Sequence, residues 1–434
     1  CGTGGGGRLM ASLLESQAAQ FAERPKTRWP RVQQWREAAL AQALRVGFPH
    51  NKLERWKYAP LRAMAGKSYG PENAEASIDA TDLPPAPRLV FVNGRFAAGL
   101  SDRQGAEDLR IETLAQALAG DDERALAVLG REFSDLEAPF AALNTALAED
   151  GLLIEAPEGT QLDRPLHLLF LHSDGASGSH YLRHRIECRE HSRLTVIEHH
   201  RGDGHGLSND LWHVHIKPQA QLVHVRIQDA GRARTAFSRC DAAIAGEAIY
   251  TRLDIDTGGH YQRHELNLAL QGRNALARSG GVLWADGNNT LDCRLVCRHQ
   301  APDTVSQLIW RGLADGKARA SFFGGIHIDA GADGSDAALS NKNLLLNAQA
   351  QINTQPALEI HADEVKAAHG ATVGQLDAGA LFYLRSRGVP ETEAVALLTR
   401  AFYAEALAVL GDDSLLAALT PFLPAVLRAE GAQP

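Results

Sequence analysis

The spacing of apolar residues changes twice along the chain. Between residues 10 and 151 they recur with a helical period, most clearly in the amphipathic segments 35–44 and 139–147. An exception is 89–96, where apolar runs flank Asn93-Gly94, a strong signal for a two-residue hairpin turn. We therefore predict a mostly helical N-terminal domain, 10–151, that contains one β-hairpin.

From residue 152 to 374 the period becomes two, and helical windows are almost absent. Turn residues such as Asp203-Gly204 and Asp286-Gly287 separate the short strands. This spacing is typical of a sandwich, a barrel or a β-solenoid. A solenoid accommodates the length best, because each turn contacts only its neighbours, although no clear sequence repeat is present. Typical strands are 166–171, 194–198, 211–216, 222–227 and 249–255.

A helical period returns in 375–434, which we assign to a C-terminal helical domain. A short helix is expected to end at Gly388, because glycine readily adopts the left-handed conformation after a last helical turn. Pro390 lies where the next helix begins. The apolar stripe of this second helix is predicted to consist of Val395, Leu398, Phe402 and Val409.

Composition and charge limit the classes of function. The 434 residues are 44% hydrophobic and 22% charged, as in an ordinary globular protein, and the formal net charge of −8 disfavours nucleic-acid and anionic membrane partners. No apolar run is long enough to span a bilayer, and residues 1–9, which read as a flexible leader or cloning remnant, lack a signal-peptide core. The five scattered cysteines read as reduced thiols, so we expect a cytoplasmic protein.

Two groups of soft side chains are candidate metal ligands. His213 and His215 share one strand face, but no carboxylate follows them as a cupin-type site requires, so solvated strand histidines are favoured. Cys293, Cys297 and His299 also share a face and could form a soft-ligand cluster. The two cysteines would lie roughly 13 Å apart on an ideal strand, so buried core residues are the favoured interpretation.

Several strings resemble the SufB/SufD family of iron–sulfur cluster assembly proteins, and its SufD branch in particular. They comprise Pro-Ala-Leu-Glu-Ile at 356–360, Asp-Glu-Val-Lys at 363–366, His-Gly-Ala-Thr-Val-Gly at 369–374, Phe-Tyr-Leu-Arg-Ser-Arg-Gly at 382–388 and Glu-Arg-Trp-Lys-Tyr-Ala-Pro-Leu at 54–61. The similarity runs from about residue 50 to 410 and is densest in its last third.

The resemblance implies a mainly β fold, a right-handed parallel β-helix between N-terminal and C-terminal helices. It implies a non-catalytic scaffold subunit of a SufBCD-type complex that assembles iron–sulfur clusters. The subunit would pair with a SufB-like paralogue through the end of the β-helix, or form a homodimer when alone. A transient cluster at the subunit interface and a reduced flavin in the complex also follow from the resemblance.

The resemblance further implies a SufC-like ATPase docked on the C-terminal helices. ATP hydrolysis would belong to that partner, consistent with 312–318, which is one residue too short for a phosphate loop and ends in Ala318 rather than a hydroxyl residue. The residues assigned to the dock are Phe382, Arg385, Arg387, Leu398 and Phe402.

His369 is the residue to which the resemblance assigns iron or cluster chemistry. The sequence has no cysteine after Cys297, so it lacks the C-terminal thiol of the SufB type, whereas His369 occupies the position of an interface histidine in SufD-type subunits. A neutral imidazole is a reasonable iron ligand beside a thiolate. The Cys-Ser pair frequent before this histidine is replaced by Ala367-Ala368.

Strand alternation leaves the orientation of His369 open. It places the residue on the core face with Val365, Ala371 and Val373, whereas a bulge at Gly370 would turn it outward. Two other functions are also retained as alternatives. One is a β-helix carbohydrate-active enzyme, which needs exposed carboxylates on one solenoid face, and the other is a cupin-like metal protein using His213 and His215.

Overall fold

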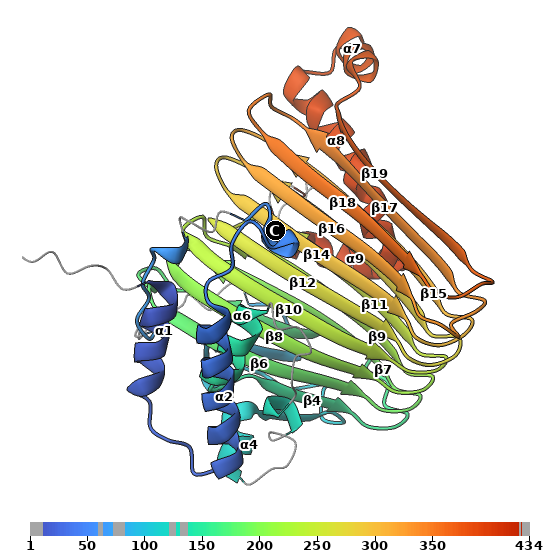
Figure 1. Cartoon of the computed structure of the whole chain (residues 1–434). Coiled ribbons are helices and arrows are strands. Elements are labelled where there is room, and N and C mark those ends of the chain that lie inside the picture. The colour runs from blue at the N-terminus through green and yellow to red at the C-terminus, as the bar shows by residue number, and fades with distance from the viewer. Residues whose placement is uncertain are drawn as a thin grey trace, which may run out of the picture.

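Two parallel sheets form the centre of the protein. The computed structural model describes residues 12–59, 64–72, 83–120, 127–130, 138–424 and 427, so the predicted leader lies outside the described residues. From β4 to β19 the strands alternate between two sheets, and successive members of each sheet pair in parallel. Two strands make one turn, and the chain winds into a parallel β-solenoid of about 8 turns (Figure 1). The predicted mainly β fold is confirmed.

We call the two sheets A and B. Sheet A contains β3 (Arg110–Thr113), β4 (Leu152–Ala156), β6 (Ser179–Cys188), β8 (Gly206–Ile216), β10 (Arg234–Ile244), β12 (Tyr261–Leu270), β14 (Thr290–His299), β16 (Arg319–Ile328) and β18 (Gln351–Ile360). Sheet B contains β1 (Arg88–Val92), β2 (Arg95–Phe96), β5 (Leu166–Leu171), β7 (Arg193–Gly202), β9 (Gln221–Ala230), β11 (Ile249–Asp256), β13 (Leu276–Ala285), β15 (Val305–Ala314), β17 (Asp336–Leu345) and β19 (Lys366–Gln375).

The turns differ in length, which explains why no repeat is visible in the sequence. Thr235 pairs with Tyr261, 26 positions later, whereas Arg319 pairs with Gln351, 32 positions later. Most of the extra residues lie in the corners between strands, where insertions do not disturb the ladders, and the others lengthen β17 relative to β11. A constant fold therefore has no constant sequence period.

The N-terminal part joins the solenoid through its strands. β1 extends sheet B beside β5, and β3 pairs with β4 in sheet A. The hairpin predicted at Asn93-Gly94 is confirmed, since β1 and β2 are antiparallel and both turn residues have positive φ, 50° and 79°, as a type I′ turn requires. The N-terminal helical elements are α1 (Leu13–Ala22), α2 (Pro30–Val46), η1 (Glu54–Trp56), η2 (Ala98–Leu100), α4 (Leu114–Gly120) and α6 (Pro139–Leu147).

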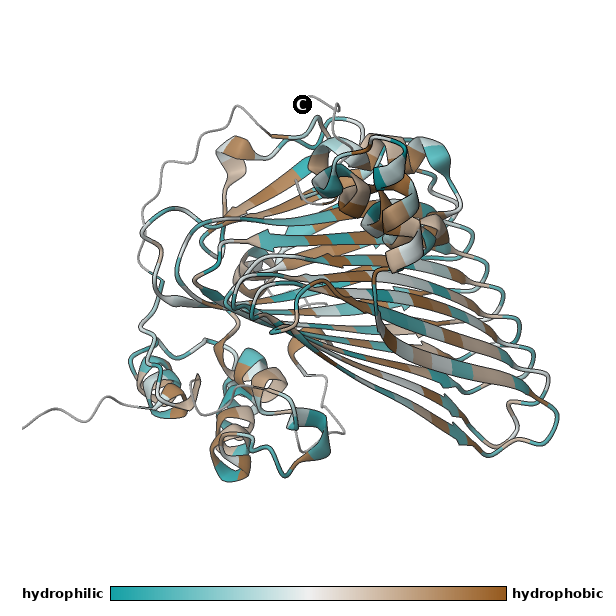
Figure 2. Cartoon of the chain, turned by 90° about the horizontal axis from the view of Figure 1, so that it is seen from above, coloured by the Kyte–Doolittle hydropathy of each residue, from teal (hydrophilic) through white to brown (hydrophobic). Residues whose placement is uncertain are grey.

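Helices cover the outer faces of both sheets, on opposite sides of the strands (Figure 2). Helices α1, α2 and α6 pack on sheet A, where Phe140 stacks on Phe237 with ring centroids 3.5 Å apart. The C-terminal helices pack on sheet B, where Tyr403 and Ala406 join the apolar side chains of β9, β11 and β13. The C-terminal elements are α7 (Ala378–Ser386), α8 (Glu391–Leu407), η3 (Ala408–Leu410), α9 (Asp413–Leu419) and η4 (Thr420–Phe422).

Helix α8 approaches sheet B closely at Gly280. A Cβ atom there would lie 2.2 Å from the carbonyl oxygen of Ala406, so only glycine fits.

Among the described helices no single one is long and apolar enough to cross a bilayer. Only the bent pair Glu391–Leu410 and Asp413–Phe422, at 119° to each other, passes that test when both are taken together.

Along the stack of turns, the interior of the solenoid is apolar toward both ends and contains charged side chains in between. Glu198, Arg226 and Asp254 are neighbours across β7, β9 and β11, and all three are buried on the inner face. Arg226 Nη1 lies 2.8 Å from Asp256, and Arg252 Nη2 lies 2.6 Å from Asp254. Opposite charges therefore alternate across these three strands, and Arg226 and Arg252 each have a carboxylate partner.

Glu198 is contacted by three side chains in this network. His200 Nε2 and His224 Nε2 lie 2.6 and 3.0 Å from its two oxygens, and the Trp212 indole donates to it at 3.2 Å. Burial opposes ionisation of Glu198, but the contacts from His200 and His224 hold its pKa well below the usual range. The carboxylate therefore stays charged inside the core.

We expect acid to destabilise this fold already at pH values well above the usual pKa of a carboxylate. Burial lowers the pKa of His184 to about 3, and that of His299 and of His167 to about 4, from 6.5. In the unfolded chain these imidazoles take up protons near pH 6.5, whereas in the folded chain they do not. The free energy of unfolding should therefore fall as the pH drops from about 6.5 to about 4, by about 1.4 kcal/mol per pH unit for each group.

Urea unfolding at several pH values, followed by tryptophan fluorescence, measures this slope. His299→Gln should reduce the slope by about one proton, because it removes one of these groups while keeping a hydrogen-bonding side chain. Gln349→Asn, an exposed substitution before β18 that changes no titratable group, is the control and should leave the slope unchanged. A free energy of unfolding that does not vary over this pH range would contradict the prediction.

Candidate functional site

The solenoid ends at β18 and β19, and no described strand or helix continues the stack there. Each is the last strand of its sheet, so within the described residues no strand pairs with their outer edges. Rows of backbone N–H and C=O groups are therefore available to another chain. We call this surface, formed by β18 and β19, the open end (Figure 1).

Apolar core positions reach the surface at the open end. Ile328 is fully buried, but Ile360, its neighbour in the next turn, is 41% exposed. Asn343 is likewise buried, whereas its neighbour Val373 is 43% exposed. These side chains point inward by register and are exposed because no further turn covers them.

His369 lies at the mouth of the core. The register between β17 and β19 is continuous, with Leu339 opposite His369 and Ser340 opposite Gly370. The bulge considered at Gly370 is therefore wrong, since regular pairing leaves no extra residue there. His369 points to the core side like the buried Leu339, yet it is exposed. The sequence left open whether His369 faces the core or the outside. Both are partly correct, because its side chain points to the core side and the core is uncovered at this end.

Cys293, Cys297 and His299 lie on the inner face of β14 and are buried. Cys297 Sγ is 4.0 Å from His299 Nε2, but that ring also contacts Thr304 Oγ1 at 2.8 Å and Ser306 Oγ at 2.9 Å. Burial raises the pKa of Cys297 to about 12 and that of Cys293 well above its usual value. Protonated thiols are poor metal ligands, so their surroundings are those of core residues.

His213 and His215 lie on the outer face of β8. The prediction of solvated side chains is wrong for His213, which is buried between Arg185 and Asp241, its neighbours in β6 and β10. His215 is half-buried. Among the described residues, no group of three or more histidine, cysteine, aspartate or glutamate side chains is arranged to hold a metal ion. The cupin-like alternative therefore has no support from the described part of the chain.

Carboxylates on the outer face of sheet A are paired with arginines. Arg239 Nε contacts Asp241 at 3.0 Å, and Arg263 contacts Glu265 at 2.7 Å and Asp292 at 2.5 Å. A glycoside-cleaving site needs two carboxyl groups that face the substrate. These three carboxylates are largely buried and held by cations, which disfavours the carbohydrate-active alternative.

Leu398 and Phe402 belong partly to the packing of α8 on sheet B. Both are half-buried, and Phe402 lies under the guanidinium of Arg311, which forms an ion pair with Glu405. The predicted apolar stripe is correct for Val409, which is buried against Gly280. Its other members, Val395, Leu398 and Phe402, are only half-buried. The buried residues of α8 are Ala394, Thr399, Tyr403, Ala406 and Leu407.

Helix α7 projects beyond the solenoid and has no buried residue (Figure 1). Its N-cap Asp377 accepts a hydrogen bond from the backbone of Ala380. Phe382 is 74% exposed, the largest value among the exposed bulky apolar residues. Arg385 contacts Glu391 at 3.3 Å, and Arg387 lies over the Tyr383 ring at 5.3 Å. The three predicted docking residues on or beside α7 thus form one exposed aromatic and basic surface.

Comparison with known proteins covers almost the whole chain. Residues 170–402 match the family described as "SUF system FeS cluster assembly, SufBD core domain", and residues 17–168 match the "SufBD protein N-terminal region". Two relatives illustrate the similarity. Iron-sulfur cluster assembly protein SufD of Escherichia coli is 30% identical over 93% of this chain and 94% of that protein. An iron-sulfur cluster assembly SufBD family protein of Synechocystis is 29% identical over 85% of both chains.

These matches extend from the N-terminal helices through the solenoid to α8, and they include the open end and His369. The core match alone spans residues 170–402, more than half of the 434 residues. The chain therefore belongs to the SufB/SufD family.

Proposed function

We propose that this chain is a non-catalytic scaffold subunit of a SufBCD-type complex that assembles iron–sulfur clusters. The observation that carries the proposal is the open end, where unpaired strand edges, an exposed apolar core and His369 occur together. The sequence similarity to iron–sulfur cluster assembly proteins also supports the proposal. A cytoplasmic location is part of the same proposal.

A SufB-like paralogue is the proposed occupant of the open end. A second solenoid with a similar end could add its last strands to β18 and β19 and cover Ile360 and Val373 at the same time. Strand addition would supply backbone hydrogen bonds, and the apolar side chains would supply buried area. When no paralogue is present, a second copy of this chain has the same complementary features and could form the homodimer.

Val373→Asp should prevent this pairing without unfolding the chain. A carboxylate at the mouth of the core stays hydrated in the free subunit but would be buried without a partner in the complex. Co-expression with SufB-like and SufC-like proteins, followed by affinity purification and size-exclusion chromatography, measures the pairing. We expect a stable ternary complex with the unchanged chain and at least a tenfold weaker association, about 1.4 kcal/mol, with the variant.

Leu44→Asp is the matched control, since Leu44 is 45% exposed on α2, away from the open end. It should pair normally. Failure of the unchanged chain to form any ternary complex would refute the scaffold proposal. Equal pairing by Val373→Asp and Leu44→Asp would place the interface elsewhere.

His369 is proposed as a ligand to iron or to the nascent cluster at this interface. Ala367, on the same strand face, provides no second soft ligand, and the described residues offer no complete metal site. The remaining ligands are proposed to come from the paralogue, with the cluster passing through as cargo. A reduced flavin in the complex is retained as part of this proposal.

His369→Ala should lower cluster yield while leaving the complex intact, because an exposed side chain on the last strand of a sheet contributes little to the fold. Cluster absorbance, with iron and acid-labile sulfide per complex, gives the yield. His205→Ala is the control, since His205 is also exposed but directly precedes β8, far from the open end. A yield unchanged by His369→Ala would remove this residue from the mechanism.

The proposed ATPase dock is the surface of Phe382, Arg385 and Arg387 together with the exposed parts of Leu398 and Phe402. Helix α8 is held on sheet B by Gly280 and by the Arg311–Glu405 pair. Movement of a docked partner would therefore be transmitted to the solenoid wall through a rigid contact. ATP hydrolysis itself is assigned to the SufC-like partner.

Phe382→Ala should reduce recovery of the SufC-like ATPase by at least about tenfold, as truncation of a central aromatic anchor does. Pairing with the paralogue and the midpoint of thermal unfolding should not change, because Phe382 is exposed and no residue of α7 is buried. Leu44→Ala provides the control for loss of an exposed apolar side chain. Full ATPase recovery with Phe382→Ala would move the dock away from α7.

A further inference from the structure

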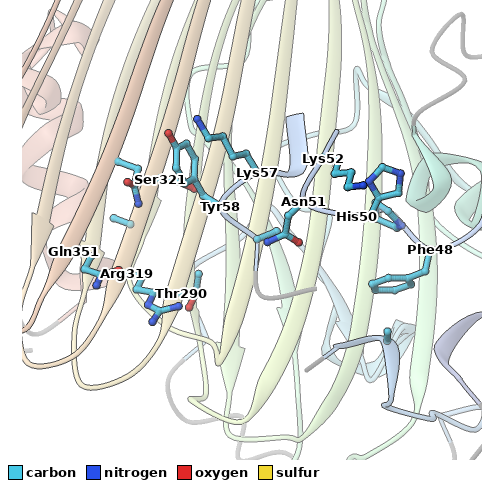
Figure 3. Close-up of a pocket in the computed structure, with 15 residues that line it drawn as sticks. Phe48, His50, Asn51, Lys52, Lys57, Tyr58, Thr290, Arg319, Ser321 and Gln351 are labelled. Atoms are coloured by element: carbon cyan, nitrogen blue, oxygen red, sulfur yellow. The ribbon is translucent and has the colours of Figure 1, made fainter. Parts of the chain in front are cut away.

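A cavity of about 820 Å³ lies between the segment that follows α2 and the strands of sheet A. One wall comes from residues 48–59, and the other comes from the first residues of β14, β16 and β18 (Figure 3). Its size is within the range of small-molecule sites. The described lining includes Phe48, His50, Lys52, Lys57, Tyr58 and Arg319.

Side-chain contacts anchor the segment 48–59 to sheet A. Trp56 is buried beneath the guanidinium of Arg263, 3.8 Å from the ring centroid. Arg55 contacts Glu265 at 3.5 Å, and Gln355 of β18 donates to Glu54 at 2.7 Å. The cavity is therefore bounded by anchored elements on both sides and is present before any ligand binds.

The lining is strongly cationic in a protein that is acidic as a whole. Lys52, Lys57 and Arg319 line the cavity, and no described lining residue carries a carboxylate. None of the three forms an ion pair with a described carboxylate, although Lys57 also lies 5.3 Å from the Tyr58 ring centroid. Asp292, which accepts a hydrogen bond from the lining residue Ser321 at 2.7 Å, is already paired with Arg263.

Aromatic and hydrogen-bonding groups accompany the cations. Phe48 and Tyr58 provide rings, while the remaining polar lining provides amides and hydroxyls from both walls (Figure 3). Cations that lack carboxylate partners favour a phosphate, and aromatic rings favour a planar group that can stack. These polar residues are Asn51, Thr290, Ser321, Gln351 and Asn353.

We propose that this cavity binds a nucleoside diphosphate or a ligand of the same chemical class, with its phosphates on Lys52, Lys57 and Arg319 and its base against Phe48 or Tyr58. The proposal concerns binding alone. The cavity reaches the open end only at Gln351 and Asn353, near the start of β18, and includes no residue of α7. Lys57 and Arg319 lie outside both surfaces, so substitutions there should leave pairing and ATPase docking intact.

Calorimetric titration of the full chain with ADP, pyrophosphate and adenosine tests the proposal. ADP should bind saturably and more tightly than pyrophosphate, which lacks the ring, and adenosine, which lacks the phosphates, should bind weakest. Arg319→Glu should weaken ADP binding at least about tenfold, and Lys57→Glu should do the same. Added salt should also weaken ADP binding.

Lys317→Glu is the matched control. Lys317 is exposed in the turn before β16, two residues from Arg319, and it does not line the cavity. This variant changes the net charge by the same amount and should bind ADP normally. The proposal is overturned if ADP does not bind saturably, if adenosine binds as tightly as ADP, or if Lys317→Glu and Arg319→Glu weaken binding equally. Pyrophosphate binding as tight as that of ADP would overturn the contact with the base.

Discussion

Backbone hydrogen bonding between successive turns is the constraint on which this structure depends. In a parallel solenoid each strand satisfies its N–H and C=O groups only through the turns before and after it. The helices can cover the faces of the sheets, but they cannot satisfy the edge of the last strand. The same rule that stabilises the interior from β5 to β17 therefore leaves β18 and β19 incomplete, and it exposes Ile360, Val373 and His369 together.

The charged interior gives the stack a second source of order. Parallel sheets with apolar inner faces tolerate a slip of two residues, because the same face stays inward. Here a two-residue slip of β11 in one direction would place Arg226 opposite Arg252 and move it away from Asp256, which lies 2.8 Å from it in the observed register. Loss of a buried partner costs about 3–5 kcal/mol for each broken pair. The network thus contributes more to the uniqueness of the register than to net stability.

Alternation in the sequence was sufficient to locate many strands and to place the interior. The run 166–171 coincides with β5. Glu198 and His200 alternate with Leu194 and Val196 on the same face of β7, so the alternation places them inside. The sequence pattern alone did not identify charged residues on an inner face. The orientation of His369 could not be derived, because its exposure depends on where the stack ends rather than on local sequence. The stripe predicted around α8 was correct for Val409 but missed Ala406, whose carbonyl oxygen approaches Gly280, a residue distant in sequence. The cavity beside Arg319 combines segments roughly 260 residues apart, a proximity that no local pattern encodes.

The contact between Glu54 and Gln355, 301 positions apart in the chain, has a consequence for synthesis. A solenoid can add one turn at a time as the chain leaves the ribosome, since each turn needs only its predecessor. The segment around Trp56 emerges early, but its binding surface on β12 forms only after about 200 more residues and its contact on β18 only after about 300. At about 5–20 residues per second this segment waits roughly 15–60 s for its last contact. Its docking therefore marks the completion of the stack, and the cavity beside it exists only in a chain whose last turn has formed.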